Sequence, residues 1–222
     1  MDTVFLLDVD NTLLDNDGVK AHLQGETRAA LGETGDRRFW DLYEQVRQEL
    51  DVVSVPVTIE RMRREWPEPE AIDRLATRLY GTPFSSFVFP GALELLRELR
   101  HEGLPVILSD GDSWYQAKKI TDAGFGGAVG GNVLIYAHKE THIDVIRHWY
   151  PADRDIAVDD KARLLGLLKQ GFGEVLTTIW IRQGHYAQGA REGNLPTPDY
   201  TVDDLAGVSA AIKKMMARPV VP

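Results

Sequence analysis

Short apolar runs alternate with longer amphipathic segments along most of this 222-residue chain. The apolar runs lie at residues 4–9, 104–108, 133–136, 156–158 and 175–181, with a shorter candidate at 200–202. Helical periodicity separates or follows them at residues 91–99, 114–123, 161–170 and 205–217. Because uniformly apolar strands that alternate with helices are typical of a parallel sheet covered on both faces, the pattern predicts an α/β fold with a doubly wound parallel sheet.

Residues 16–89 break this alternation. Their periodicity is helical, at 39–50, 59–66 and 72–79, and the one short strand candidate is Val52-Val53. The Pro90-Gly91 step then returns the chain to the sheet. We therefore expect a core domain at 1–15 and 90–222 and an inserted α-helical cap subdomain at 16–89. Its position after the first strand predicts a lid over the site, with a packing extension as the alternative.

Composition narrows the class of function. The formal net charge of -9 and the pI near 5.2 give no basic footprint, which disfavours nucleic-acid binding. The absence of cysteine excludes disulfides, thiolate catalysis and Cys-ligated zinc. The first apolar run is short and lacks a basic leader, and no run has membrane-spanning length. We expect a cytoplasmic protein that acts on a small metabolite, and the oligomeric state stays open.

The first apolar run ends in two carboxylates, Asp8 and Asp10. Carboxyl ends of parallel strands form the edge where α/β sheets place their sites. Two carboxylates at one position repel each other, and a hard cation such as Mg²⁺ relieves the repulsion. An ionised carboxylate can attack phosphorus while a neighbouring carboxyl group protonates the leaving oxygen. This pair is therefore the first candidate for catalysis, with solvated residues at a strand end as the alternative.

Polar residues follow two further runs. Ser109-Asp110-Gly111 closes the second run, where a hydroxyl and the N–H groups of the following turn could bind a phosphoryl oxygen, although such residues occur in many turns. Asp159-Asp160 closes the fourth run. Adjacent acids at the end of a buried strand are costly unless a cation shares them, so with Asp8 they suggest a metal site.

Lys139 follows the third run. Its compact positive charge could neutralise both a carboxylate nucleophile and an incoming phosphate. Lys118 and Lys119 compete for this role, but they lie inside a predicted helix rather than at the exit of a strand. We therefore assign the role to Lys139.

The predicted strands are followed, in chain order, by two acids, a hydroxyl, a lysine and two further acids. With its polar residues in this order, the chain resembles the haloacid dehalogenase (HAD) superfamily of phosphohydrolases. The first motif of that superfamily is D-x-D-x-T, and the four motifs are matched by Asp8, Asp10 and Thr12, by Ser109, by Lys139 and by Asp159-Asp160. The resemblance covers residues 2 to about 183. A helical insertion between the first and second motifs is the usual position of one kind of cap in that superfamily.

The resemblance implies covalent phosphoryl transfer. Asp8 would form an aspartyl phosphate, and Asp10 would protonate the departing alcohol and then activate water. Phosphoryl oxygens would be held by Ser109 and Lys139, and the substrate-binding loops would be completed by Thr12, Asp110 and Gly111.

The metal implied by the resemblance is Mg²⁺, bound by the Asp8 carboxylate, the Asp10 backbone carbonyl and Asp160, with Asp159 a further ligand or a partner of the ligands. Many relatives carry another acid four or five residues after the ligand of the fourth motif, but Leu164 and Leu165 occupy those places here. Which member of the Asp159-Asp160 pair binds the metal directly therefore stays open.

Members named for dehalogenation lack an acid two residues after the nucleophile, because halide needs no proton to leave. Asp10 therefore favours a phosphatase that acts on a small phosphate monoester. A haloacid dehalogenase-type hydrolase and a catalytically silent binding protein are the alternatives, whereas a signalling receiver would place its lysine last. Candidates for substrate contact are the polar residues after Asp10 and two aromatic residues after the second motif, namely Asp15, Asp17, Lys20, His22, Arg28, Trp114 and Tyr115.

Overall fold

A computed structural model describes residues 2–188 and 195–217. Its central feature is a six-stranded sheet in the order β3-β2-β1-β4-β5-β6, and every neighbouring pair is parallel. The strands are β1 (Thr3–Leu7), β2 (Leu104–Asp110), β3 (Val133–Tyr136), β4 (Arg154–Asp159), β5 (Leu176–Ile181) and β6 (Tyr200–Val202). The prediction of a parallel α/β sheet is confirmed.

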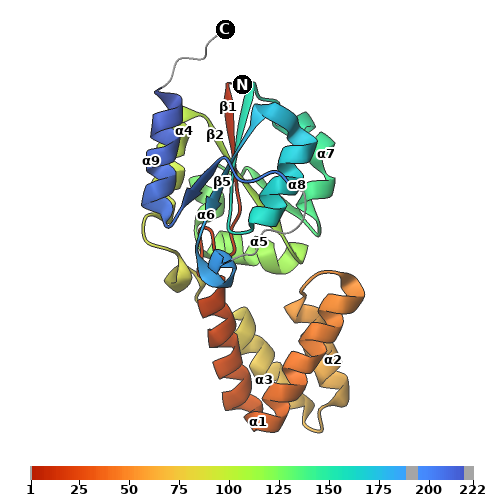
Figure 1. Cartoon of the computed structure of the whole chain (residues 1–222). Helices are drawn as coiled ribbons and strands as arrows, with labels where there is room; N and C mark the ends of the chain where they lie inside the picture. The colour runs from red at the N-terminus through yellow and green to blue at the C-terminus, as the bar shows by residue number, and fades with distance from the viewer. Residues whose placement is uncertain (1, 189–194, 218–222) are drawn as a thin grey trace.

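Helices cover both faces of this sheet (Figure 1). The helices α4 (Ala92–Glu102) and α9 (Leu205–Met216) lie on one face, and α7 (Ile143–Trp149) and α8 (Ala162–Phe172) lie on the other. The path from β2 to β3 runs through α5 (Ser113–Asp122) and α6 (Phe125–Ala128). Among the described residues, no helix combines the length and the apolar character that crossing a membrane requires.

The position of β1 explains why the first apolar run has no polar face. The strand pairs with β2 on one side and β4 on the other, so that Leu7 lies opposite both Ile107 and Val158. Strand order reverses between β1 and β4, because the chain leaves β1 toward β2 and β3 and later returns to β4. In open α/β sheets this reversal opens a crevice at the carboxyl edge.

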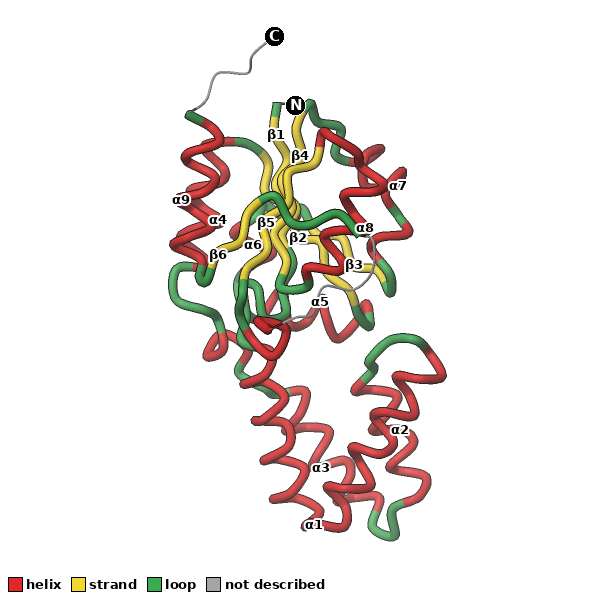
Figure 2. The backbone as a smooth tube through the Cα atoms, viewed as in Figure 1, coloured by secondary structure: helices red, strands yellow, loops and turns green. Residues whose placement is uncertain are grey.

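The segment between β1 and β2 is helical and extends beyond the carboxyl edge of the sheet (Figure 2). It contains α1 (Asn16–Leu50), α2 (Val55–Glu65), α3 (Pro69–Tyr80) and the 3-10 turn η1 (Phe84–Phe87). The path of α1 is broken at Gly32, whose φ of 68° is readily available to glycine, and α1 there turns back on itself (Figure 1). We call residues 16–89 the helical segment.

The strand candidate Val52-Val53 is wrong. Both residues lie in the connection between α1 and α2, where Asp51 has a left-handed φ of 55°. A chain that turns sharply at this point offers no extended run that could pair with another strand. Three further 3-10 turns complete the described secondary structure: η2 (Lys139–Thr141), η3 (Gly173–Val175) and η4 (Gly184–Gln188).

Candidate active site

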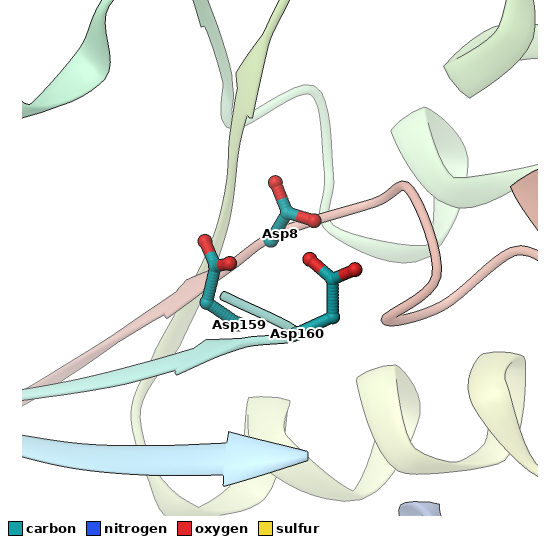
Figure 3. Close-up of side chains that lie close together, drawn as sticks. All are labelled: Asp8, Asp159 and Asp160. Carbon is teal, nitrogen blue, oxygen red and sulfur yellow. The ribbon is translucent and has the colours of Figure 1, made fainter. Parts of the chain in front are cut away.

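Three acidic side chains meet at the strand reversal (Figure 3). Asp8 follows β1, while Asp159 ends β4 and Asp160 comes next. Each is buried, and one carboxylate oxygen from each lies within 4.8 Å of the others. Parallel pairing of β1 with β4 brings these acids together, although about 150 residues separate them along the chain.

Asp160 is the unsatisfied member of this cluster. Both of its carboxylate oxygens are buried and have no hydrogen-bond partner among the described residues. Burial, reinforced by the nearby negative charges of Asp159 and Asp8, raises the pKa of Asp160 to about 9. A buried carboxylate without a partner is costly, and an oxygen-seeking divalent cation would relieve that cost. The three acids therefore fit a Mg²⁺ ion.

Lys139 contacts two of these acids and is completely buried, with a relative exposure of 1%. Its ammonium nitrogen lies 2.6 Å from Oδ1 of Asp8 and 2.7 Å from Oδ2 of Asp159, and it donates to the carbonyl oxygen of Leu108 at 3.0 Å. Burial alone would lower the pKa of Lys139, but the Asp159 and Asp8 carboxylates raise it above its usual range. The positive charge of Lys139 therefore compensates the negative charges of Asp8 and Asp159.

Asp159 differs from Asp160 in having partners for both oxygens. Besides the Lys139 ion pair, its Oδ1 accepts a hydrogen bond from the backbone N–H of Lys161 at 2.8 Å. Burial acts to lower the pKa of Lys161, but Asp8, Asp159 and Asp160 raise it above its usual range. Lys161 is a second cation beside the acids, and the sequence reasoning missed it.

Thr12 lies beneath the nucleophile candidate. Its hydroxyl donates to Oδ2 of Asp8 at 3.2 Å, and Thr12 itself is buried. The loop reverses direction at Asn11, which has a left-handed φ of 56°. The N–H groups of Thr12, Leu13 and Leu14 all point to the carbonyl oxygen of Val9. This tight turn fixes Asp8 and Asp10 relative to each other.

The second predicted motif closes the site beside β1. Ser109 is buried at the end of β2, and Oδ1 of Asp110 accepts a hydrogen bond from the backbone N–H of Lys139 at 2.8 Å. Burial raises the pKa of Asp110 to about 6. Gly111 has a φ of 140°, and a Cβ there would lie 2.8 Å from the side chain of Gln116. Asp110 and Gly111 thus shape the loop.

Asp10 is held by α5. The Lys119 ammonium nitrogen lies 2.6 Å from its Oδ1, and the Gln116 side-chain amide donates to its Oδ2 at 3.1 Å. The same amide donates to the Ser109 hydroxyl at 3.2 Å and to the Asp110 carbonyl oxygen at 2.8 Å. The sequence reasoning discounted Lys119 and did not name Gln116. Their spacing of three residues places both on one face of α5, which was the available signal.

A cleft of about 470 Å³ opens between this edge and the helical segment. It is lined from the edge by Asp10, Asp110, Gly111, Gln116, Lys119, Asp160 and Lys161, among others, and from the helical segment by residues of α1 and the α1–α2 connection. Across the cleft, the Ser54 hydroxyl donates to Oδ2 of Asp112 at 2.8 Å, and Nε2 of His138 lies 2.9 Å from Oδ2 of Asp51. These contacts join the helical segment to the sheet side of the molecule.

Among the candidates for substrate contact, Asp17, Lys20 and Tyr115 line the cleft. Asp15 instead caps α1, His22 packs against Phe87, Arg28 pairs with Asp36, and Trp114 packs edge-on against Tyr80.

A further contact lay beyond sequence reasoning. Nδ1 of His185, in η4, lies 2.6 Å from Oδ1 of Asp17, and Asn11 donates to the same oxygen at 3.2 Å. No local pattern links residues so far apart in the chain.

Comparison with known proteins places the chain in a family. Over 98% of its length, and 99% of the other chain, it superposes with a TM-score of 0.89 and 39% identity on a protein of Burkholderia xenovorans assigned to the haloacid dehalogenase-like hydrolases. The chain belongs to the haloacid dehalogenase-like hydrolases. No protein-family model and no curated protein sequence matches it.

Two more distant structures share the fold. A HAD hydrolase of Bacillus subtilis bound to magnesium, which reveals interdomain movement, matches with 13% identity and a TM-score of 0.61 over 98% of this chain and 99% of that one. The L-2-haloacid dehalogenase of Xanthobacter autotrophicus matches with 16% identity and a TM-score of 0.60 over 97% of this chain and all of the other. Identities this low show a shared fold alone.

Proposed function

We propose that this hydrolase is a Mg²⁺-dependent phosphatase that cleaves a small phosphate monoester through an aspartyl phosphate on Asp8. One observation carries the proposal. Asp160 is buried beside Asp8 with both oxygens unpartnered, which makes the cluster a cation site next to a nucleophile. Phosphoryl transfer depends on positioning and on charge neutralisation, and a cation there would supply the second.

The first half of the reaction would begin with attack of an Asp8 carboxylate oxygen on phosphorus. The bond from phosphorus to the ester oxygen breaks, and Asp10 gives a proton to the departing alcohol. Ser109 and the turn at Gly111 would hold phosphoryl oxygens, while Lys139 keeps a positive charge next to Asp8. Thr12 keeps Asp8 oriented through its 3.2 Å hydrogen bond.

In the second half, Asp10 takes a proton from water, whose oxygen attacks the phosphorus of the aspartyl phosphate. Phosphate leaves and Asp8 is restored. Asp10 in this structure accepts hydrogen bonds from Lys119 through one oxygen and from Gln116 through the other. These contacts would hold its carboxyl group in place for both proton transfers.

Mg²⁺ would be bound by the Asp8 carboxylate, the Asp10 backbone carbonyl and Asp160. When bound, it would neutralise negative charge on the transferring phosphoryl group. Of the Asp159-Asp160 pair, we assign Asp160 as the direct ligand because neither of its oxygens has a partner. Asp159 would instead hold the Lys139 ammonium group and the backbone N–H of Lys161. The magnesium-bound structure of the Bacillus subtilis hydrolase supports this choice of metal.

We also propose that residues 16–89 form a cap over the site and that residues 1–15 and 90–222 form the core. The cleft is lined from both parts, so the cap would contribute to substrate choice. The Ser54–Asp112 and Asp51–His138 contacts would hold the cap in the state seen here. Movement would take place near Asn16 and near Gly91, where the two connections between the parts lie.

A haloacid dehalogenase-type reaction is the second candidate, because the Xanthobacter autotrophicus enzyme shares the fold. Asp10 and the unpartnered Asp160 argue against it, since displacement of halide needs neither a proton donor nor a cation site.

The test is phosphate release from a panel of small monoesters with Mg²⁺ and with EDTA, next to chloride release from 2-chloropropionate. We expect phosphate release that EDTA abolishes and that Asp8→Asn lacks. Chloride release without phosphate release would replace the proposal with the dehalogenase alternative.

A further inference from the structure

Lys20 lines the α1 side of the cleft. It lies in the first part of α1, and no carboxylate of the described residues forms an ion pair with it. Its ammonium nitrogen lies instead over two aromatic rings, 5.5 Å from the centroid of Trp40 and 5.7 Å from that of Tyr43. Such contacts attract a cation and orient it while leaving its N–H donors available.

Three of the other basic side chains along the described lining lie against an acid. Lys119 pairs with Asp10 at 2.6 Å, Arg47 with Glu44 at 2.8 Å and His185 with Asp17 at 2.6 Å. Lys161, at the edge of the sheet beside the metal cluster, instead lies over the ring of Tyr186, 5.4 Å from its centroid. A new anion in the cleft would therefore meet Lys20 without breaking an ion pair.

The acids that line the same part of the cleft have partners other than Lys20. Asp17 and Glu44 have the partners just given, and Asp51 lies 2.9 Å from Nε2 of His138. Asp112 accepts from Ser54 and from the backbone N–H of Tyr115. None of these acids pairs with Lys20, so its ammonium group is available to an anion in the cleft.

The wall around Lys20 is apolar and aromatic. Val19, Leu23, Val55 and the ring of Tyr43 line the cleft there. Lys20 itself is exposed to solvent, so an anion that enters the cleft can reach it. The single positive charge of Lys20 balances a carboxylate but only part of the charge of a phosphate group, which is about −1.5 to −2 at pH 7.

We propose that Lys20 binds a carboxylate at the end of the substrate remote from the scissile phosphate, so that the substrate class is a phosphorylated carboxylic acid. This inference rests on the proposed function, because it places the phosphate at Asp8. The substrate would span the cleft, with its phosphate at the edge of the sheet, its carboxylate at Lys20 and its carbon body along the apolar wall.

The experiment compares esters that differ only at the remote end: 3-phosphoglycerate with glycerol 1-phosphate, and 4-carboxyphenyl phosphate with phenyl phosphate. The kcat/KM ratio of the charged ester to the neutral ester is measured for wild type, Lys20→Met, Lys20→Arg and Lys214→Met. Methionine keeps the apolar stem of Lys20. Lys214 is an exposed lysine of α9 outside the cleft, so it serves as the matched control.

We expect wild type to prefer the charged ester of at least one pair. Lys20→Met should lower that ratio on the order of tenfold, mainly through KM, because it removes a charge-assisted hydrogen bond. Lys20→Arg should retain most of the preference, and Lys214→Met should not change it. An unchanged ratio in Lys20→Met, or an equal loss for both esters, would overturn the proposal.

A binding measurement separates this proposal from the proposed function. Calorimetry gives the affinity of the same esters for Asp8→Asn and for Asp8→Asn combined with Lys20→Met, both with Mg²⁺. Tighter binding of the charged ester that is lost in the double variant supports the role of Lys20 even if wild type releases no phosphate, in which case the proposed function alone fails. Equal binding of both esters to the two variants overturns the role of Lys20.

Discussion

The ammonium nitrogen of Lys119 lies 2.6 Å from Oδ1 of Asp10, although the two residues come from different elements and are separated by 109 positions. Lys119 is buried, with a relative exposure of 3%, and it also donates to Oδ1 of Asn16 at 3.0 Å. It therefore ties the candidate acid and base of the site to the first residue of α1. A change at Lys119 should disturb both the position of Asp10 and the connection to the helical segment.

We expect Lys119→Met to lower kcat for a phosphate monoester by roughly tenfold to a hundredfold with little change in KM. General acid and base catalysis contributes about 10² to 10⁴ in rate, and a displaced Asp10 would lose part of that. Steady-state kinetics test this. Lys118→Met is the matched control, because Lys118 lies next to Lys119 but pairs with Asp122 away from the cleft. Equal losses in the two variants would remove the proposed role of Lys119.

Asp160→Asn should abolish stabilisation by Mg²⁺. In wild type, Mg²⁺ at about a hundred times its Kd should raise the Tm by roughly 5 to 10 °C, because a ligand that binds the folded state stabilises it by mass action. The neutral amide would lose that gain and would also relieve the buried, unpartnered carboxylate in the metal-free protein. Thermal unfolding with Mg²⁺ and with EDTA reports both effects. A Mg²⁺ shift retained in full would exclude Asp160 as a ligand.

Lys139→Met should destabilise the metal-free protein by about 3 to 5 kcal/mol, because it leaves Asp8 and Asp159 buried without their cation. Urea unfolding in EDTA measures the change. Mg²⁺ should restore part of the loss, since it replaces some of the missing positive charge. A variant as stable as wild type in EDTA would mean that the ion pairs add little to the fold.

Asp155, which lies outside the active site, should make the free energy of unfolding depend on pH. Burial raises its pKa to about 6, so the folded state holds the Asp155 proton more tightly than the unfolded state does. Its contribution to the stability is therefore greatest below about pH 4 and declines as the pH rises through 6. Asp155→Asn should remove this decline and stabilise the protein at pH 7 by at most about 3 kcal/mol. Urea unfolding of both proteins at pH 5 and pH 8 tests this, and parallel curves would contradict it.

The sheet could be predicted from the sequence because its strands are apolar on both faces. Phe5 and Leu7 pack into one core and Val4 and Leu6 into the other, so no polar face obscured the pattern. The prediction of a strand at Val52-Val53 was wrong because it rested on the strand preference of β-branched residues. Asp51, which precedes them, has a left-handed backbone conformation that turns the chain.

The residues that end strands were found from the sequence because the topology brings strand ends to one edge. The residues that reach the site from within a helix, or from a segment far along the chain, were not found from the sequence. Lys119 lies two turns into α5. Its spacing from Gln116 places both residues on one face of the helix, but the packing of α5 decides that this face meets Asp10. His185 meets Asp17 across 168 positions, which only the folded chain shows. The lack of a hydrogen-bond partner for either oxygen of Asp160 is likewise seen only in the folded structure.

The central claim, a covalent intermediate on Asp8, is tested most directly with a ³²P-labelled aryl phosphate. The reaction is quenched in acid after one turnover, and the labelled peptide is identified. We expect label on the peptide that contains Asp8, labile to hydroxylamine, absent in Asp8→Asn and accumulating in Asp10→Asn, which cannot activate water. Release of labelled phosphate with no protein-bound label in either wild type or Asp10→Asn would contradict the account.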